Sequence, residues 1–287
     1  MKSDENDLQP AQGILFLVGT PIGNLEDISP RSRRVLTEVE VIFAEDTRKT
    51  RVLLSHLEVF SKQLNRYSES DRVKATDWVL SFLARGANVA LVTDAGMPSI
   101  SDPGSHLVRA CVEAGFKVVV VPGPTAESAA VALSGAVEGP YLFCGFMRPV
   151  RRWLETYATS AADVAAALVG YVAPHDVAKV LIHLGDVIGE QANVVVCREM
   201  TKVFEERIEG PIDQLLLHRR IVDPKGEYVI VVPASSLVAA ISAPGSDLIF
   251  AVIASCLDRH ATRSDRARTI ASLTGVPRSE IYESLGD

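Results

Sequence analysis

The feature that most constrains the fold of this chain is a repeated alternation of short, continuous apolar runs with longer segments of helical periodicity. In the first half, the apolar runs are residues 14–18, 39–44, 89–92 and 117–121. A run that is apolar at every position is typical of a strand buried on both faces, as in parallel sheets with helical crossovers. The helices expected between them are residues 29–38, 47–57, 71–84 and 102–114. The pattern therefore predicts an α/β domain around a mostly parallel sheet.

A second α/β domain is expected to begin near Gly139. Its shorter, alternating apolar patterns indicate a mixed sheet, with strands at residues 141–146, 168–172, 193–198, 204–209 and 227–232. Beyond Pro233 the composition changes to Ala, Ser, Pro and Gly, as in a linker. Three helices are then expected, at 248–259, at 264–273 and from Ser279, with a turn at 275–277; together they resemble a helix-turn-helix module. The predicted organisation is a disordered tail (1–12), an N-terminal α/β domain (13–138), a C-terminal α/β domain (139–233), and a linker with a small helical extension (234–287).

Composition excludes several classes of protein. Hydrophobic residues make up 47% of the chain and charged residues 23%, which is ordinary for a folded globular protein. The net charge of −7 argues against a surface that grips RNA broadly through its phosphates, so any RNA contact must be local. No apolar run approaches the roughly 20 residues that cross a bilayer, and the polar N-terminus is unlike a signal peptide. We therefore expect a soluble, cytoplasmic protein with no membrane association.

The cysteines and histidines do not suggest a metal site. Cys111, Cys144, Cys197 and Cys256 are scattered through apolar stretches, with neither a Cys-x-x-Cys pair nor a histidine at ligand spacing. We interpret them as reduced core residues. His106, His175 and His218 are likewise interpreted as structural groups, and we predict no bound metal.

Loops rich in glycine, proline and polar residues follow the apolar runs, at the edge where open α/β sheets bind ligands. Residues 19–25 read Gly-Thr-Pro-Ile-Gly-Asn-Leu and match neither common nucleotide-binding fingerprint, so taken alone they indicate a structural turn. In residues 45–50, Asp46 and Thr47 can simply cap a helix. Alternatively, Asp46, Arg48 and Lys49 can face a substrate. Both interpretations remain open.

Two further loops carry a stronger signal. Residues 93–104 combine glycines, which let a ligand approach the main chain, with prolines that fix the loop and carboxylates that accept hydrogen bonds. A rigid turn is the alternative interpretation. Residues 122–128 begin Pro-Gly-Pro-Thr directly after another apolar run. Four such loops at one edge predict a binding site more firmly than any one of them.

Taken together, these loops resemble the tetrapyrrole methylase family, and within it the branch that methylates a ribose 2′-hydroxyl of small-subunit ribosomal RNA. The resemblance spans about residues 14–233. Its defining stretches are residues 19–28, 44–50, 94–104 and 121–124, with later matches at 145–149, 198–202 and 225–227. The occurrence of all four loop motifs in this order makes the resemblance specific.

The resemblance implies two α/β domains with S-adenosylmethionine in the cleft between them, usually in a homodimer. It also implies that the substrate is a cytidine ribose in small-subunit ribosomal RNA, either free or in the assembled subunit. The basic edge of the C-terminal helices (Arg259, Arg263, Arg266, Arg268) is a candidate RNA contact, although a solvated helix face is the simpler interpretation. The residues expected to contact the cofactor are Pro21, Gly23, Thr93, Asp94, Ala95, Gly96, Pro98, Asp102, Pro122, Gly123, Pro124, Thr125, Ala126, Arg198, Lys225, Gly226 and Glu227.

Two segments depart from the pattern of the branch. Residues 170–176 read Gly-Tyr-Val-Ala-Pro-His-Asp and lack the glutamate and final arginine that are typical there. Residues 66–71 read Arg-Tyr-Ser-Glu-Ser-Asp in place of a stretch rich in histidine and asparagine. If these segments form the RNA side of the cleft, substrate binding or activity is affected while the cofactor loops stay intact.

For catalysis we nominate Asp46 as the base and Arg48 as a group that orients RNA phosphate, because both lie beside the predicted cofactor loops. Two other functions share those loops. One is methylation of a tetrapyrrole ring carbon, as in corrin or sirohaem synthesis. The other is a catalytically impaired, cofactor-binding protein that associates with RNA.

Overall fold

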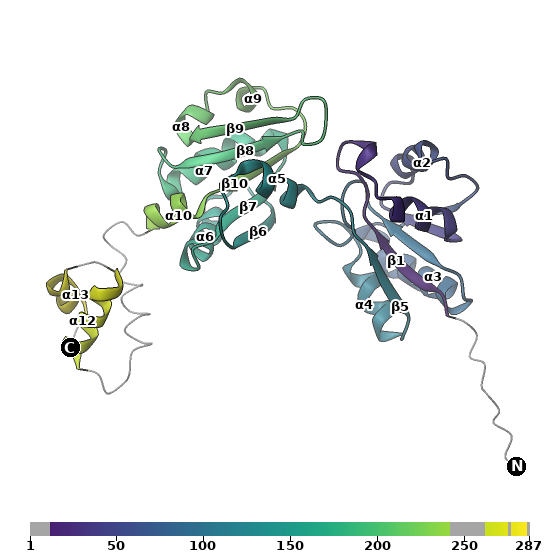
Figure 1. Cartoon of the computed structure of the whole chain (residues 1–287), viewed down its shortest axis with the longest axis horizontal. Coiled ribbons are helices and arrows are strands. Elements are labelled where there is room, and N and C mark those ends of the chain that lie inside the picture. The colour runs from purple at the N-terminus through teal and green to yellow at the C-terminus, as the bar shows by residue number, and fades with distance from the viewer. Residues whose placement is uncertain (1–11, 242–261, 275–276, 286–287) are drawn as a thin grey trace, which may run out of the picture.

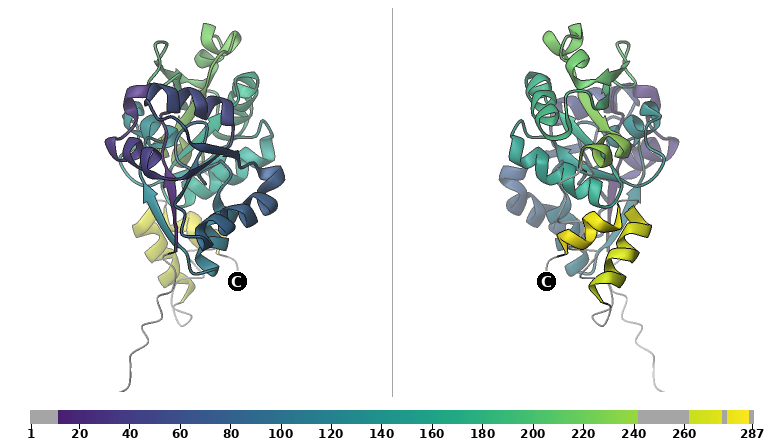
Figure 2. Two further views of the ribbon diagram at one scale, coloured as in Figure 1. Left: turned by 90° about the vertical axis from the view of Figure 1, so that its right-hand side faces the viewer. Right: turned by 90° about the vertical axis from the view of Figure 1, so that its left-hand side faces the viewer.

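The structure, a computed structural model, describes residues 12–241, 262–274 and 277–285. Two five-stranded sheets, each covered by helices, follow one another along the chain, and a pair of short helices follows them (Figure 1). Figure 2 looks along the line that joins the two sheet units, from either end. The predicted pair of α/β units with a small helical extension is confirmed.

The first sheet is parallel throughout, with strand order β3-β2-β4-β1-β5. Its strands are β1 (Ile14–Val18), β2 (Val41–Ala44), β3 (Gln63–Arg66), β4 (Val89–Val92) and β5 (Lys117–Val121). Its helices are α1 (Pro30–Glu38), α2 (Thr47–His56), α3 (Arg72–Ala84) and α4 (Ser105–Glu113). Apolar residues of α1 and α2 pack on one face, and those of α3 and α4 on the other. The expected parallel sheet is confirmed.

Three details of this sheet differ from expectation. Strand β3 was not predicted, because it is an edge strand with the polar sequence Gln-Leu-Asn-Arg. Strand β2 begins at Val41 and not at residue 39, since the Val39 N–H still bonds to the Val35 carbonyl at the end of α1. Helix α4 begins at Ser105 and not at residue 102, since its N-cap is Gly104 with a φ of 155°.

The second sheet is mixed, with strand order β6-β7-β10-β8-β9. Strands β6 and β7 pair in parallel and the other pairs are antiparallel, so the expected mixed sheet is confirmed. Its strands are β6 (Tyr141–Phe146), β7 (Ala167–Val172), β8 (Asn193–Arg198), β9 (Glu206–Pro211) and β10 (Tyr228–Val232). Strand β9 starts two residues later than expected, because residues 199–205 form a turn with exposed Val203 and Phe204 at its tip.

Helices cover both faces of this second sheet. Helices α6 (Arg151–Asp163) and α7 (Val177–Ile188) pack on one face, and short helices α8 (Ile212–Leu215) and α9 (Arg219–Val222) connect β9 to β10. Helix α5 (Ala126–Ser134) packs on the other face, against β7, β8 and β10. It lies within the range 13–138 expected for the first domain, yet its core contacts belong to the second. We therefore propose that the chain crosses between the units at residues 122–125.

The segment after Pro233 was expected to be a linker, and for residues 234–241 this was wrong. They form α10 (Ala234–Ile241), whose Leu237 is buried in the core beside α6 and α7. Helices α12 (Arg263–Thr274) and α13 (Arg278–Ser284) match the last two expected helices and pack together through Ala267, Ile270 and Ile281. Residues 1–11 of the expected tail (1–12) lie outside the described residues. So do the expected helix at 248–259 with Cys256 and Arg259, and most of the turn at 275–277.

The remaining cysteines are free thiols, as expected. Cys111 and Cys197 are buried and Cys144 is half-buried. Burial raises the pKa of each thiol, to about 12 for Cys144. Across the described part of the chain, no helix is both long enough and apolar enough to cross a membrane.

Candidate functional site

The loops that follow β1, β4 and β5 meet at one edge of the first sheet. Thr20 and Gly96 exchange backbone hydrogen bonds of 2.9 and 3.2 Å, and the Thr20 hydroxyl donates to the Thr93 carbonyl oxygen at 3.2 Å. The N–H of Gly19 donates to the carbonyl oxygen of Val121 at the end of β5. These main-chain contacts hold the three loops in a fixed arrangement.

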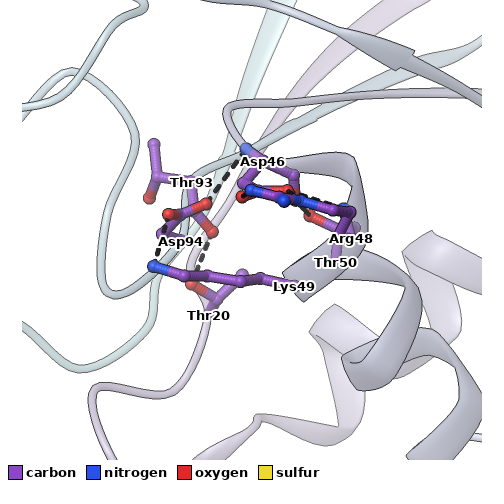
Figure 3. A network of polar contacts seen from close by, with 7 residues as sticks. All are labelled: Thr20, Asp46, Arg48, Lys49, Thr50, Thr93 and Asp94. Atoms are coloured by element: carbon purple, nitrogen blue, oxygen red, sulfur yellow. Dashed lines mark hydrogen bonds and ion pairs between the residues drawn. The ribbon is translucent and has the colours of Figure 1, made fainter.

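The loop after β2 joins this arrangement through Asp94 (Figure 3). Its Oδ1 accepts a hydrogen bond from the Asp46 N–H at 3.0 Å, and its Oδ2 accepts one from Lys49 Nζ at 2.8 Å. Asp94 therefore ties the start of α2 to the loop after β4. The expectation that the predicted loops converge at one edge is confirmed.

A cavity of about 390 Å³ lies between this edge and the second sheet. The first unit contributes the loop after β4, with Ile22 and Glu45 beside it. The second unit contributes the ends of β6, β7 and β10, together with Met200. Seven of the expected cofactor residues line the cavity: Asp94, Ala95, Gly96, Asp102, Thr125, Ala126 and Glu227.

The other expected cofactor residues do not line the cavity. Pro21 and Gly23 line a smaller hollow of about 210 Å³ that also includes Lys49 and Asp94. Gly23 is also close to the second unit, since a Cβ on it would stand 2.5 Å from Thr201 Oγ1. The remainder are absent from the cavity wall: Thr93, Pro98, Pro122, Gly123, Pro124, Arg198, Lys225 and Gly226.

Arg198 has a clear structural role instead. The residue is 5% exposed, and its guanidinium donates to the carbonyl oxygens of Lys225 and Phe204 at 2.8 and 3.2 Å. It therefore fixes the loop before β10 against the turn between β8 and β9. Arg198 shapes the cavity indirectly, because Glu227 and Met200 on these segments form part of its wall.

Asp46 and Arg48, the expected catalytic pair, do not line the cavity. Asp46 caps α2 by accepting from the Arg48 N–H at 2.8 Å, and its carboxylate pairs with the Arg48 guanidinium at 2.7 Å. Hydrogen bonds from Arg48 hold the pKa of Asp46 well below its usual value. Of the two interpretations of this loop, the helix cap is the one that the contacts support.

Two carboxyl groups in the cavity, those of Asp102 and Glu45, have raised pKa values that the sequence did not reveal. Burial, together with repulsion from Glu45 and Asp94, raises the pKa of Asp102 to about 7. The pKa of Glu45 is also raised, by burial and by the charge of Asp94. A carboxyl group with a pKa near 7 is suited to accept and release protons at neutral pH. The sequence motifs indicated only a cofactor contact for Asp102, and within residues 45–50 they indicated no role for Glu45.

Strained backbone accompanies these groups. Ser99 and Ser101, in the loop that carries Asp102, have φ values of 71° and 60°. Residues other than glycine rarely adopt a positive φ, and those that do are concentrated at functional sites.

The two departures from the branch pattern have different positions. In residues 170–176, Tyr171, Val172, Ala173 and Pro174 line the cavity, and the Tyr171 hydroxyl donates to the buried carboxylate of Glu127. Residues 66–71 contribute nothing to its wall. Tyr67 is instead buried, with its hydroxyl 3.2 Å from Thr76 Oγ1. Only the first departure can affect a ligand in the cavity directly.

The described residues include no group of three or more His, Cys, Asp or Glu side chains arranged to hold a metal ion. His106 Nδ1 lies 3.2 Å from the Thr76 hydroxyl, and His218 accepts from the Arg220 N–H. His175 lies 3.4 Å from Asp176.

Comparisons with known proteins agree with this architecture. Residues 15–216 match the model of the family described as Tetrapyrrole (Corrin/Porphyrin) Methylases. Relatives named ribosomal RNA small subunit methyltransferase I include those of Synechocystis sp. (36% identical, covering 94% of this chain and 96% of the relative) and Xylella fastidiosa (37%, covering 94% and 98%). The relative of that name from Thermotoga maritima is 39% identical and covers 76% of this chain and 97% of its own length. A crystal structure of diphthine synthase shares the fold, with a TM-score of 0.63 and 14% identity, covering 79% of this chain and 94% of that one.

Proposed function

Given that this chain belongs to the tetrapyrrole methylase family, we propose that it is an S-adenosylmethionine-dependent methyltransferase acting on the ribose 2′-hydroxyl of a cytidine in small-subunit ribosomal RNA. The observation that carries the proposal is the cavity formed by the converging loops, in a chain that matches small-subunit ribosomal RNA methyltransferases over nearly its whole length. The match to those relatives also favours RNA over a tetrapyrrole as substrate.

The residues of the cavity fit the proposed cofactor. The volume of the cavity lies within the range of pockets that hold small-molecule ligands and cofactors. The carboxylates of Asp94 and Glu227, each paired with a lysine, keep lone pairs that can accept hydrogen bonds from ribose hydroxyls or an amino group. Ile22, Met97 and Val229 supply apolar surface for an adenine ring. S-adenosylmethionine would supply an electrophilic methyl group on a positively charged sulfur.

We assign the acceptance of the hydroxyl proton to Asp102. A ribose hydroxyl is a weak acid, so removal of its proton as the oxygen–methyl bond forms lowers the barrier. Asp102 lines the cavity, and its pKa of about 7 leaves a substantial ionised fraction at neutral pH. Asp46 and Arg48 stay the alternative assignment, but their carboxylate and guanidinium already pair with each other.

The remaining parts of the proposal concern the setting of the reaction. We propose a cytoplasmic homodimer that acts on the small-subunit RNA or on the assembled subunit. Arg266 and Arg268 of α12 lie in the helical extension that we propose as a further RNA contact. Arg263 instead donates to the carbonyl oxygen of Tyr282 in α13, which favours a structural role for that side chain.

The test is methyl transfer from labelled S-adenosylmethionine to small subunits isolated from cells that lack this protein, followed by mapping of ribose methylation. We expect one labelled ribose, on a cytidine, that is also methylated in cells that contain the protein. Label in an extracted porphyrinoid and not in RNA would indicate a tetrapyrrole methyltransferase. Calorimetric binding of the cofactor without any methylation of RNA, subunits or porphyrinoids would indicate a binding protein that has lost catalysis.

A further inference from the structure

A second hollow, of about 470 Å³, opens beside the cavity. Its wall combines the chain from Cys144 to Pro149, two aromatic residues of α6, and the start of the turn before α7. Three residues line both spaces: Ser101, Phe146 and Ala173. The hollow therefore adjoins the cavity at the position where Ser101 precedes Asp102 in the chain.

We call this space the aromatic hollow, because the rings of Phe146, Trp153 and Tyr157 line it. Trp153 and Tyr157 lie one turn apart on α6, with ring centroids 4.2 Å apart and ring planes inclined by 36°. Phe146, at the end of β6, is 58% exposed although it is a large apolar side chain. Half-exposed aromatic rings around a concave surface are typical of sites where nucleic-acid bases stack.

Three arginines lie in or next to one wall of the aromatic hollow, and the one carboxylate in its lining, Asp176, lies within 4 Å of His175 and Lys179. Arg148 lines the hollow, and Arg151 and Arg152 follow at the start of α6; all three side chains are exposed. Within the described part of the chain, none of the three forms an ion pair with an acidic residue. In a chain with a net charge of −7, such a local group of unpaired guanidiniums favours an anionic partner such as phosphate.

The floor of the aromatic hollow is tightly packed. Met147 is buried, and its N–H donates to the Tyr171 carbonyl oxygen at 2.8 Å. Cys144 Sγ donates to the Val169 carbonyl oxygen at 3.2 Å. Gly170 permits this packing, since a Cβ on it would stand 2.6 Å from Met147 Cγ. The hollow is thus formed before any ligand arrives, which reduces the ordering cost of binding.

We propose that the aromatic hollow binds the base of a single-stranded RNA nucleotide, the one whose ribose is methylated, by stacking on Trp153 and its neighbouring rings. Arg148 binds the adjoining phosphate. The ribose then lies at the boundary of the two spaces, beside Ser101, with the Asp102 carboxyl group next along the chain. This inference rests on the proposed function, because it gives the RNA substrate of that reaction its place in the structure.

Fluorescence offers a direct test, because Trp78 and Trp153 are the only tryptophans of the chain. Trp78→Phe leaves Trp153 as the sole reporter, and Trp153→Phe leaves Trp78 as the matched control. Trp78 is 45% exposed and packs on Phe43 in the first unit, away from the hollow. Titration with a short single-stranded oligocytidylate is expected to quench Trp153 and to leave Trp78 unchanged. An RNA duplex of the same length should quench Trp153 much less, since its bases are already stacked.

A second measurement separates stacking from folding. Trp153→Leu is expected to weaken oligocytidylate binding about tenfold, while Trp153→Phe retains most of the affinity. Both variants should bind S-adenosylmethionine as the wild type does, since Trp153 lies outside the cofactor cavity. The proposal is overturned if Trp153 fluorescence is unchanged at saturating oligocytidylate, or if Trp153→Leu binds it with undiminished affinity. A protein that binds no S-adenosylmethionine would contradict the proposed function instead, and the quenching measurement does not depend on that cofactor.

Discussion

Gly19 and Gly123 lie backbone against backbone: a Cβ built on Gly19 would stand 2.6 Å from the Cα of Gly123, and one built on Gly123 would stand 2.8 Å from the Cα of Gly19. The two residues follow β1 and β5, neighbouring strands of the parallel sheet. No side chain longer than hydrogen fits at either position without movement of the main chain. The contact therefore sets how closely the loops after β1 and β5 approach each other beside the cavity.

Gly123→Ala is expected to lower the free energy of unfolding by about 1–3 kcal/mol, because the added methyl group must displace backbone atoms. Thr125, two residues further along the same loop, lines the cavity. Displacement of the loop should therefore lower the affinity for S-adenosylmethionine as well. Denaturant unfolding and calorimetry measure the two effects. Gly139→Ala is the matched control, since a Cβ there meets nothing within 4 Å. Equal stability of the two variants would contradict the close packing of Gly123.

Asp102→Asn is expected to stabilise the protein at pH about 8 and to have little effect at pH about 3. The pKa of Asp102 rises from 3.8 to about 7 on folding, so its ionisation opposes folding. Stability from this group is fully present below its unfolded pKa and is lost as the pH rises toward 7. The amide cannot ionise and escapes that loss. Melting temperatures of the variant and the wild type across this range test the sign, and a variant that is less stable at pH about 8 contradicts it.

The rate of methyl transfer under single-turnover conditions is expected to rise with pH and to level off above about 7, as Asp102 loses its proton. Asp102→Asn should remove this dependence and reduce the rate by about 10²–10⁴-fold, as for loss of a general base. Asp46→Asn is the informative comparison, because its carboxylate caps α2 and lies outside the cavity wall. If Asp46→Asn loses the larger share of the rate with unchanged cofactor binding, Asp46 is the base and Asp102 is not.

Arg198→Lys is expected to destabilise the fold with little direct effect on the cofactor. A lysine ammonium cannot reproduce the planar fork that reaches two carbonyl oxygens, and a hydrogen bond that involves a charged group contributes about 1.5–3 kcal/mol. Thermal unfolding should show the loss, whereas Arg219→Lys, at an exposed arginine, should show almost none. A large fall in cofactor affinity without loss of stability would restore the cofactor contact expected for Arg198.

Much of the fold could be predicted because it depends on local patterns. Strands β2 and β4 are apolar at every position, and the structure buries every residue of both. The edge strand β3 escaped prediction because one side of it has no neighbouring strand, so it needs no apolar run. Helix α10 escaped for a different reason. Its small residues are typical of a linker, and only the presence of α6 and α7 makes Leu237 a core residue.

The candidate site divides in the same way. Glycine and proline motifs can be recognised in the sequence because they reflect the backbone conformation of their own loop. Each motif directly follows an apolar run, so the convergence of the loops at one edge of a parallel sheet could be anticipated.

By itself, the sequence determined the two α/β units and the loops that meet between them, because periodicity and turn residues act over a few neighbouring positions. Only the tertiary structure decided that Asp102, and not Asp46, faces the cavity with a pKa near 7, and that Trp153 and Phe146 share one hollow. Burial and the repulsion of charges act through space. They therefore depend on residues far apart in the chain, such as Glu45 and Asp102, that only the folded structure brings together.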